Sequence, residues 1–400
     1  MSASFDRPDE TRGEADHSAP RAGRLACFCP PGVPVEGAGA VDLPDAKWGT
    51  ALLAGGFALS VLSQTLVLGL VPLAGSLMAP TANLVTAPYI AMLIGAAAAT
   101  FPASFLLDAF GRRAAFALGA STGVAGGFVM AWALVANAFV PFCLGAFWLG
   151  IAQGFSLFYR HEAALGSGGQ GRAMAIGIVF GAGTLAGLAG PALAVAAQVF
   201  FPESLFVGAA LAAAISQVAV LALAVVSAGR APVVAKPLGA ARPAPAPTDW
   251  RAFAAPTFIA AIAWFAMTAQ MVATPAAMAA CGIPVGSVLN AVAWHVIAMY
   301  APAFVAGAVA KLTGARTLAL LGLAAIVVAR YVSSQAAGYI GFTAGLILVA
   351  VGWSLSTAAA TMWLHREARP TRVALAAHDG LLFLAAILGA VAAIAPLGAR

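Results

Sequence analysis

The sequence predicts an all-α membrane protein with eleven membrane-spanning helices in two bundles. Of its 400 residues, 62% are hydrophobic and only 8% are charged, whereas soluble domains carry about 25% charged residues. Eleven apolar runs follow one another along the chain, each long enough to cross a bilayer as a helix. A polar, proline-rich segment at residues 230–250 separates the first six runs from the last five.

Each element follows from its composition. Residues 1–47 mix Pro, Gly and both signs of charge, which predicts a disordered tail. Helices are expected after it, because lipid cannot satisfy the backbone of an irregular chain. We therefore expect a six-helix N-terminal bundle at 48–229, a stiff linker at 230–250 and a five-helix C-terminal bundle at 251–400. The predicted spans are 49–77, 84–107, 114–136, 139–163, 173–199, 205–228, 252–280, 284–310, 317–334, 337–363 and 373–397.

Basic residues indicate how the spans are oriented, because cytoplasmic loops carry an excess of Lys and Arg. With the tail and linker in the cytoplasm, 18 of the 20 Lys and Arg residues fall on that side, and only Arg330 and Arg400 do not. We therefore expect a multi-pass protein of a bacterial inner membrane, surrounded by the lipid bilayer, with a cytoplasmic N-terminus. The basic residues are scattered over loops, so the net charge of +6 does not indicate a nucleic-acid partner.

A short polar gap, Asp108-Ala-Phe-Gly111-Arg112-Arg113, separates the second and third apolar runs. Gly111 permits a tight turn. We interpret the gap as a cytoplasmic latch in which Asp108 pairs with basic groups or with the start of the eleventh helix, where the helix dipole favours an anion. The simpler alternative is that Arg112 and Arg113 only anchor the loop on the cytoplasmic side.

A related loop, residues 311–316, lies between the eighth and ninth runs. Gly111 aligns with Gly314 and Arg113 with Arg316, each pair 203 residues apart. Both loops follow the second span of a bundle. This echo suggests two duplicated bundles, a pattern common in transporters.

Together these features resemble the major facilitator superfamily of secondary transporters, over residues 49–397. Its loop signature combines Asp, Gly and Arg or Lys, as residues 108–113 do, and a signature of its fifth span ends in Gly-Pro amid small residues. The match to the second signature consists of Gly183, Gly187, Gly190 and Pro191. The resemblance implies two bundles that rock about a midplane solute site. The Gly190–Pro191 element is associated with exporters, so export is favoured over import; the glycines also suit close helix packing, and Pro191 is expected to bend the span.

The chain departs from the superfamily pattern at three points. Ser104 and Phe105 stand where the loop signature has a glycine. Gly150 stands three residues before Gln153-Gly154, where the superfamily places an Arg that has a proton-linked role. The superfamily has twelve spans, and eleven are predicted here. Other stretches, including Phe158-Tyr-Arg160, resemble a bacterial branch with vitamin and drug carriers.

Charged residues near the ends of two spans are further candidates. At the end of the fourth span, Glu162 is expected to pair with Arg112 or Arg113, and Arg160 with Asp108; the alternative is a solvated helix end. Asp379 lies about two turns into the eleventh span. Three interpretations of Asp379 remain open: a gating group, a proton carrier or a solvated helix start.

His295 is the one titratable group predicted near mid-membrane, in the eighth span. Ionisable groups inside a membrane are functional candidates, and a histidine can exchange a proton near neutral pH. His295 is therefore a candidate for proton coupling beside Asp379. The alternative is a neutral histidine bonded to a neighbouring helix.

A central cavity is expected to hold a few polar groups among aromatic rings, which suits an amphipathic organic solute. Each candidate also has a packing interpretation. The candidates are Gln64, Gln153, Trp264, Gln270, Asn290, Trp294 and Trp353.

The predicted function is secondary transport of a small organic solute, coupled to protons, by a monomer with no cofactor or metal. The cysteines Cys27, Cys29, Cys143 and Cys281 show no zinc or disulfide spacing, and no nucleophile or phosphate-loop motif indicates an enzyme. The alternative is a non-transporting membrane scaffold or assembly factor with the same fold. A channel is disfavoured, because the sequence has no ring of charge or filter motif.

Overall fold

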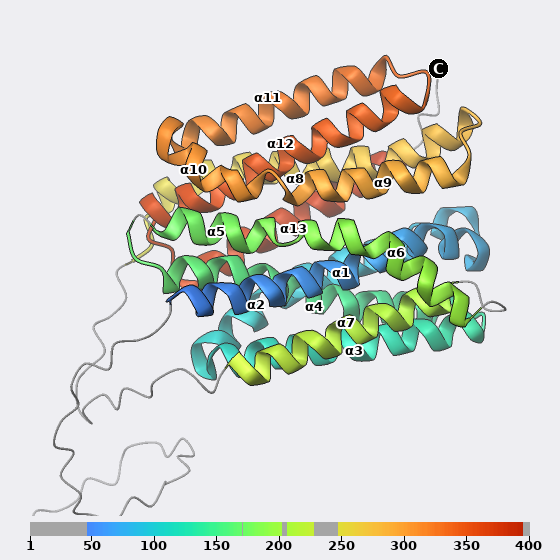
Figure 1. Cartoon of the computed structure of the whole chain (residues 1–400), viewed down its shortest axis with the longest axis horizontal. Coiled ribbons are helices and arrows are strands. Elements are labelled where there is room, and N and C mark those ends of the chain that lie inside the picture. The colour runs from blue at the N-terminus through green and yellow to red at the C-terminus, as the bar shows by residue number, and fades with distance from the viewer. Residues whose placement is uncertain (1–45, 170, 202–205, 228–246, 395–400) are drawn as a thin grey trace, which may run out of the picture. The chain divides into compact units, whose positions relative to one another are not determined.

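A computed structural model describes residues 46–169, 171–201, 206–227 and 247–394. The predicted tail lies outside the described residues except for 46–47, which begin the first helix, and so does the predicted linker except for 247–250. Figure 1 follows the helices along the chain by colour. Their bounds are α1 Ala46–Met78, η1 Ala82–Leu84 (a 3-10 turn), α2 Ala87–Ala109, α3 Gly111–Val135, α4 Phe139–Gly166, α5 Gly171–Gly181, α6 Thr184–Phe200, α7 Val207–Ser227, α8 Trp250–Ala280, α9 Val285–Tyr300, α10 Ala303–Thr313, α11 Ala315–Ser334, α12 Tyr339–Glu367 and α13 Arg372–Ile394.

The predicted all-α membrane fold is confirmed over this part of the chain. Ten stretches are long and apolar enough to span a bilayer, and the pair α9 and α10, bent by 40°, makes an eleventh. Helices α5 and α6 form one span, Gly171–Phe200. Large apolar side chains such as Phe105, Trp132 and Val327 are more than half exposed on the outside of the bundle, as expected of surfaces that face lipid tails.

Both related loops contain a glycine with a positive φ. Gly111 has φ +78° and Gly314 has φ +86°, in the left-handed region where a side chain is strained. Gly111 begins α3 and Gly314 directly precedes α11, which are the third and ninth spans. The duplication suggested by the sequence therefore extends to the turn geometry.

The first six spans and the last five meet along two pairs of helices. Helix α2 packs on α13, while α5 and α6 pack on α10 and α9. Glycines bring the second pair close: a Cβ added to Gly177 would lie 2.6 Å from the Ala303 carbonyl oxygen, and one added to Gly187 would lie 2.8 Å from the Ile297 nitrogen. Small residues at helix crossings permit this approach.

Gly150 has a similar packing role within the N-terminal half. A Cβ on Gly150 would lie 1.9 Å from the Met92 carbonyl oxygen of α2, and one on Gly154 would lie 2.4 Å from the Ala96 carbonyl oxygen. No arginine fits at position 150, because the α2 backbone occupies the space that its side chain needs. The departure from the superfamily pattern is therefore tied to a close crossing of α2 and α4.

Candidate functional site

A central cavity lies between the two halves. It has a volume of about 50 Å³ and is lined by side chains of both halves. Six aromatic residues dominate the lining, and the ring of Trp353 lies 5.3 Å from Trp264, 5.4 Å from Phe180 and 5.9 Å from Tyr300 between centroids. Such spacings are typical of favourable tilted and edge contacts. The aromatic residues are Phe57, Tyr89, Phe180, Trp264, Tyr300 and Trp353.

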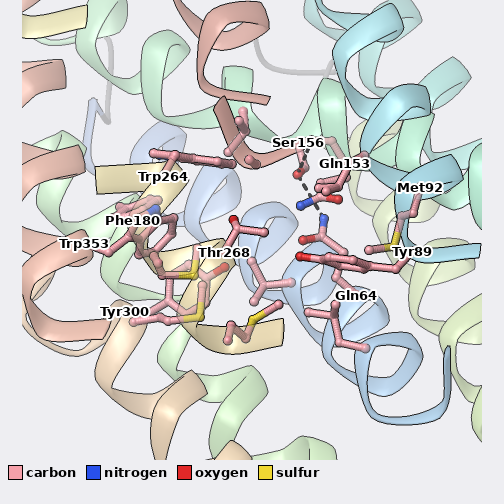
Figure 2. A pocket seen from close by; sticks show the side chains of 18 of the residues that line it. Gln64, Tyr89, Met92, Gln153, Ser156, Phe180, Trp264, Thr268, Tyr300 and Trp353 are labelled. Atoms are coloured by element: carbon pink, nitrogen blue, oxygen red, sulfur yellow. Dashed lines mark hydrogen bonds between the residues drawn. The ribbon is translucent and has the colours of Figure 1, made fainter. Parts of the chain in front are cut away.

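Polar groups occupy one side of this cavity. Figure 2 shows Gln64 and Gln153 opposite the cluster that contains Trp264, Phe180 and Trp353. The Gln64 side-chain amide donates to the Ser156 hydroxyl at 3.4 Å. Two buried atoms, Gln153 Oε1 and Trp353 Nε1, have no hydrogen-bond partner among the described residues. Two residues of the cavity lining therefore each carry a polar atom without a partner among the described residues, one an acceptor and one a donor.

Four of the seven predicted cavity residues line this space: Gln64, Gln153, Trp264 and Trp353. The rings of Tyr89, Phe180 and Tyr300 were not among the candidates. Phenylalanine occurs in ten of the eleven apolar runs and the five tyrosines fall in five of them, so only their position in the fold distinguishes these three.

The other three predicted cavity residues lie elsewhere, which corrects their assignment. Gln270 donates to the Ser333 hydroxyl at 2.7 Å and to the Gly345 carbonyl at 3.0 Å, so it joins α8 to α11 and α12. Asn290 is exposed and donates to the Tyr339 hydroxyl at 3.2 Å. Trp294 is 51% exposed on the outside of α9. Each sits on a helix face turned away from the cavity.

At one end of the bundle, helices α2, α4, α10 and α12 end and α3, α5, α11 and α13 begin; we call it the charged end. Its outer layer centres on Glu162, which is fully buried and pairs with Arg112 and Arg372. Arg372 also contacts Asp108 at 2.7 Å. Because Arg372 begins α13, the predicted contact of Asp108 with the start of the eleventh helix is present in the structure. Arg113 makes no ion pair within the described ranges.

A deeper layer of the charged end joins α4 to α12 and α13. Arg160 Nη2 lies 2.5 Å from Asp379 Oδ1, and His161 Nε2 lies 3.2 Å from Asp379 Oδ2. His161 Nδ1 lies 2.9 Å from His365 Nε2. His378 Nδ1 lies 2.9 Å from the Thr257 hydroxyl of α8. We call Arg160, His161, His365, His378 and Asp379 the inner cluster; each is almost completely buried.

The inner cluster corrects two predictions. Arg160 pairs with Asp379 rather than with Asp108, because it points between the halves while Asp108 is 59% exposed at a helix end. The interpretation of Arg160, Glu162 and Asp379 as solvated helix ends is also wrong, since all three side chains are fully buried.

His161 and His365 are not among the candidates of the sequence analysis, although the sequence holds a signal for them. They are 204 residues apart, close to the 203-residue spacing of Gly111 and Gly314. They therefore occupy nearly equivalent places in the fourth and tenth spans. The structure brings the two histidines into contact, with His161 Nδ1 2.9 Å from His365 Nε2.

Solved structures of transporters have a fold similar to that of this chain. No known protein-family profile matches the sequence. The structure is similar to that of the human organic anion transporter MFSD10, with a TM-score of 0.67 and 13% identity over 87% of this chain and 93% of that one. It is also similar to FucP, a major facilitator superfamily transporter in its outward conformation, with a TM-score of 0.59 and 14% identity over 87% and 90%.

A relative at higher identity decides the family. The riboflavin transporter RfnT of Brucella anthropi is 32% identical over 309 residues, which are 76% of this chain and 77% of RfnT. The chain belongs to the major facilitator superfamily. It is accordingly a multi-pass membrane transporter of a small-molecule solute and not an enzyme.

Within this superfamily fold, His295 lies apart from both candidate regions. It is fully buried, and its Nδ1 lies 2.8 Å from the Leu346 carbonyl oxygen of α12. It contacts neither the central cavity nor the inner cluster. This placement matches the alternative of a histidine bonded to a neighbouring helix.

The glycines of the fifth-span signature pack against helices of both halves. A Cβ on Gly183 would lie 2.6 Å from the Tyr300 ring, and one on Gly190 would lie 3.2 Å from Thr65 of α1. Pro191 lies inside α6, and the break between α5 and α6 comes earlier, at residues 182–183. The break lies beside Tyr300, which lines the cavity.

Proposed function

We propose that this protein transports a flavin-like solute, and riboflavin is the first one to test. The observation that supports this proposal is the central cavity, whose lining combines six aromatic residues with two polar atoms that lack a partner among the described residues, Gln153 Oε1 and Trp353 Nε1. A flavin is a planar aromatic ring system whose edge carries an N–H donor and carbonyl acceptors. The rings offer stacking surfaces, and the acceptor Gln153 Oε1 and the donor Trp353 Nε1 can each pair with a different polar group of such a solute. The similarity to a riboflavin transporter supports the same class of solute.

The proposed cycle is alternating access. A cavity of about 50 Å³ holds only a few water molecules, so the two halves have to separate before a tricyclic solute can enter. The charged end suits a latch, since Arg372, Asp108 and Glu162 join the halves there. Opening at that end would break these contacts while α2 and α13 move apart.

The finer assignments extend the same proposal. The surplus of Lys and Arg favours a cytoplasmic position for the charged end, with the chain in a bacterial inner membrane. A proton gradient is the proposed energy source, and the Gly190–Pro191 element favours export. Transport in vesicles of known orientation, with the pH gradient applied in either direction, tests both assignments.

The direct test is riboflavin movement in reconstituted vesicles. We expect the purified protein to move riboflavin, followed by its fluorescence, and expect Trp353→Phe to raise the apparent KM. This change keeps a ring but removes the indole N–H; one lost hydrogen bond corresponds to about 1 kcal/mol, or about fivefold. The matched control is Trp294→Phe, because Trp294 is half exposed outside the cavity.

Two results would count against this assignment. Absence of riboflavin movement, together with movement of an unrelated solute, would remove the flavin-like substrate and retain the transporter. An equal KM change in Trp353→Phe and Trp294→Phe would show that the cavity does not recognise the solute.

A further inference from the structure

Two histidines of the inner cluster meet between the halves, at nearly equivalent positions of the duplication. His161 is fully buried and His365 is 4% exposed, and their facing nitrogens are 2.9 Å apart. This is a hydrogen bond between two titratable groups from opposite halves. We propose that the His161–His365 pair is the proton-binding site of this transporter, and that it takes up a single proton when the halves separate at the charged end. This inference rests on the proposed proton coupling, and it names the residues that bind the coupled proton.

The contacts fix how the protons are arranged in the pair. His161 Nε2 lies 3.2 Å and 3.3 Å from the two Asp379 carboxylate oxygens, which only accept, so this nitrogen carries a hydrogen. In neutral His161, Nδ1 is then an acceptor. His365 Nε2 must therefore donate across the 2.9 Å contact.

One added proton exchanges the donor and acceptor roles in the His161–His365 hydrogen bond. His161 would then donate from both nitrogens, to Asp379 and to His365, and His365 would become the acceptor by carrying its hydrogen on Nδ1. A second proton would set two donors and two positive charges against each other at 2.9 Å. The pair therefore has room for a single added proton, which comes from and returns to water.

Charge links this proton to the conformation. In the closed cluster the positive charge of Arg160 and the negative charge of Asp379 cancel. An added proton would leave a net buried charge, which is costly. The other groups facing the pair do not offset it: Arg172 of α5 donates to the His365 carbonyl at 3.0 Å, and His378 of α13 lies beside His161.

The carboxylate nearest the pair in the chain is already engaged. Glu162 is held by Arg112 and Arg372 in the outer layer, and Tyr300 of α9 lies on the Arg160 side, with its ring against Trp353. When the halves separate, water reaches the histidines and the cost of the charge falls. By linkage, a ligand that binds the open state better shifts the equilibrium toward it, so the proton favours opening at the charged end.

The test measures opening without any solute. Spin labels are placed at Phe110→Cys, directly after α2, and Val373→Cys of α13, which are 65% and 58% exposed on opposite halves of the charged end, after Cys27, Cys29, Cys143 and Cys281 are replaced by serine. The distance distribution is recorded between about pH 5 and 8, the range in which histidine changes charge. In the otherwise unchanged protein, we expect the ratio of open to closed states to rise at least about fivefold on acidification, a typical allosteric coupling.

The variants separate the histidine pair from other groups. His161→Gln and His365→Gln should each remove the pH response, because glutamine keeps a hydrogen-bonding amide but cannot take up the proton. His295→Gln is the matched control, a buried histidine outside the cluster, and should keep the full response. Elution as a single species in detergent checks that each variant is folded.

Three outcomes would overturn the inference: no pH response in the unchanged protein, a response that survives both histidine substitutions, or a response lost in His295→Gln. A response that survives both histidine variants but disappears in Asp379→Asn would assign the proton to the carboxylate. Since the measurement uses no solute, failure of riboflavin transport would not affect it. A failed pH response would likewise leave the flavin proposal standing.

Discussion

At the scale of the residue, the buried ion pair of Arg160 and Asp379 governs the inner cluster. Both side chains are fully buried, and the Nε and Nη1 atoms of Arg160 have no partner among the described residues. Within the described ranges, Asp379 is thus the only carboxylate that pairs with this guanidinium. Removing one member of such a pair is far more damaging than removing both, because it leaves an uncompensated buried charge.

Asp379→Asn should therefore destabilise the protein by about 3–5 kcal/mol. The double variant with Arg160→Gln should recover a large part of that loss, and a double-mutant cycle from unfolding in detergent measures the coupling. Asp108→Asn is the control, because Asp108 is 59% exposed and exposed pairs contribute no more than about 1 kcal/mol. Additive losses at the two cluster positions would contradict this account.

At the scale of the element, the crossing of α5 with α10 depends on the absence of side chains. Gly177 faces the Ala303 carbonyl, and Gly307 faces the Ala173 carbonyl, where an added Cβ would lie 2.8 Å away. These neighbours are backbone atoms, so a new methyl group cannot be accommodated by a rotamer change. The two halves have to shift instead.

Gly177→Ala should lower stability by about 1–3 kcal/mol, the usual effect of overpacking, even though alanine is the better helix former. Thermal unfolding in detergent measures the change. Gly286→Ala in α9 is the matched control, because nothing lies within 4 Å of its added Cβ, and its stability should stay within about 0.5 kcal/mol. Equal behaviour of the two variants would show that the close crossing is unimportant.

At the scale of the whole molecule, the ionic contacts between the halves are gathered at one end. In the part of the chain that the structure describes, the contacts of Arg160, His161 and Arg372 with carboxylates of the opposite half all lie at the charged end. Arg316 and Glu367 also pair there, but both belong to the C-terminal half. Substitutions in the pairs between the halves test closure, and a substitution in the pair within one half serves as a control for local stability.

Arg372→Gln should expose the cavity from the charged end. The reporter is Ser156→Cys, 2% exposed and lining the cavity, in the background without native cysteines. Its reaction with a membrane-impermeant maleimide should accelerate at least about fivefold, because weakening the closed state by about 1 kcal/mol changes the open population by that factor. Arg316→Gln, which breaks a pair within one half, should leave the rate unchanged, and acceleration by both variants would exclude a specific latch.

Hydropathy was sufficient to predict the spans, because lipid requires long apolar helices and the structure has them. It was not sufficient to predict which side of each helix faces inward. In a membrane the outer face is as apolar as the inner one, so Trp294 and Trp353 look alike in the sequence although one faces outward and the other lines the cavity. The partner of Arg160 was missed because it depends on how α4 crosses α13, which no local pattern records.

The duplicated loops carry opposite charges at one equivalent position. Asp108 corresponds to Lys311 at the 203-residue spacing. The loop on the α2–α13 side therefore supplies a carboxylate, which contacts Arg372, and the equivalent loop supplies a cation. On the α5–α10 side, Lys311 shares a surface depression with Arg172 and Arg366, and like charges gather above the glycine-packed crossing. We therefore expect an asymmetric opening, in which α2 and α13 move apart while α5 and α10 stay in contact and act as the pivot.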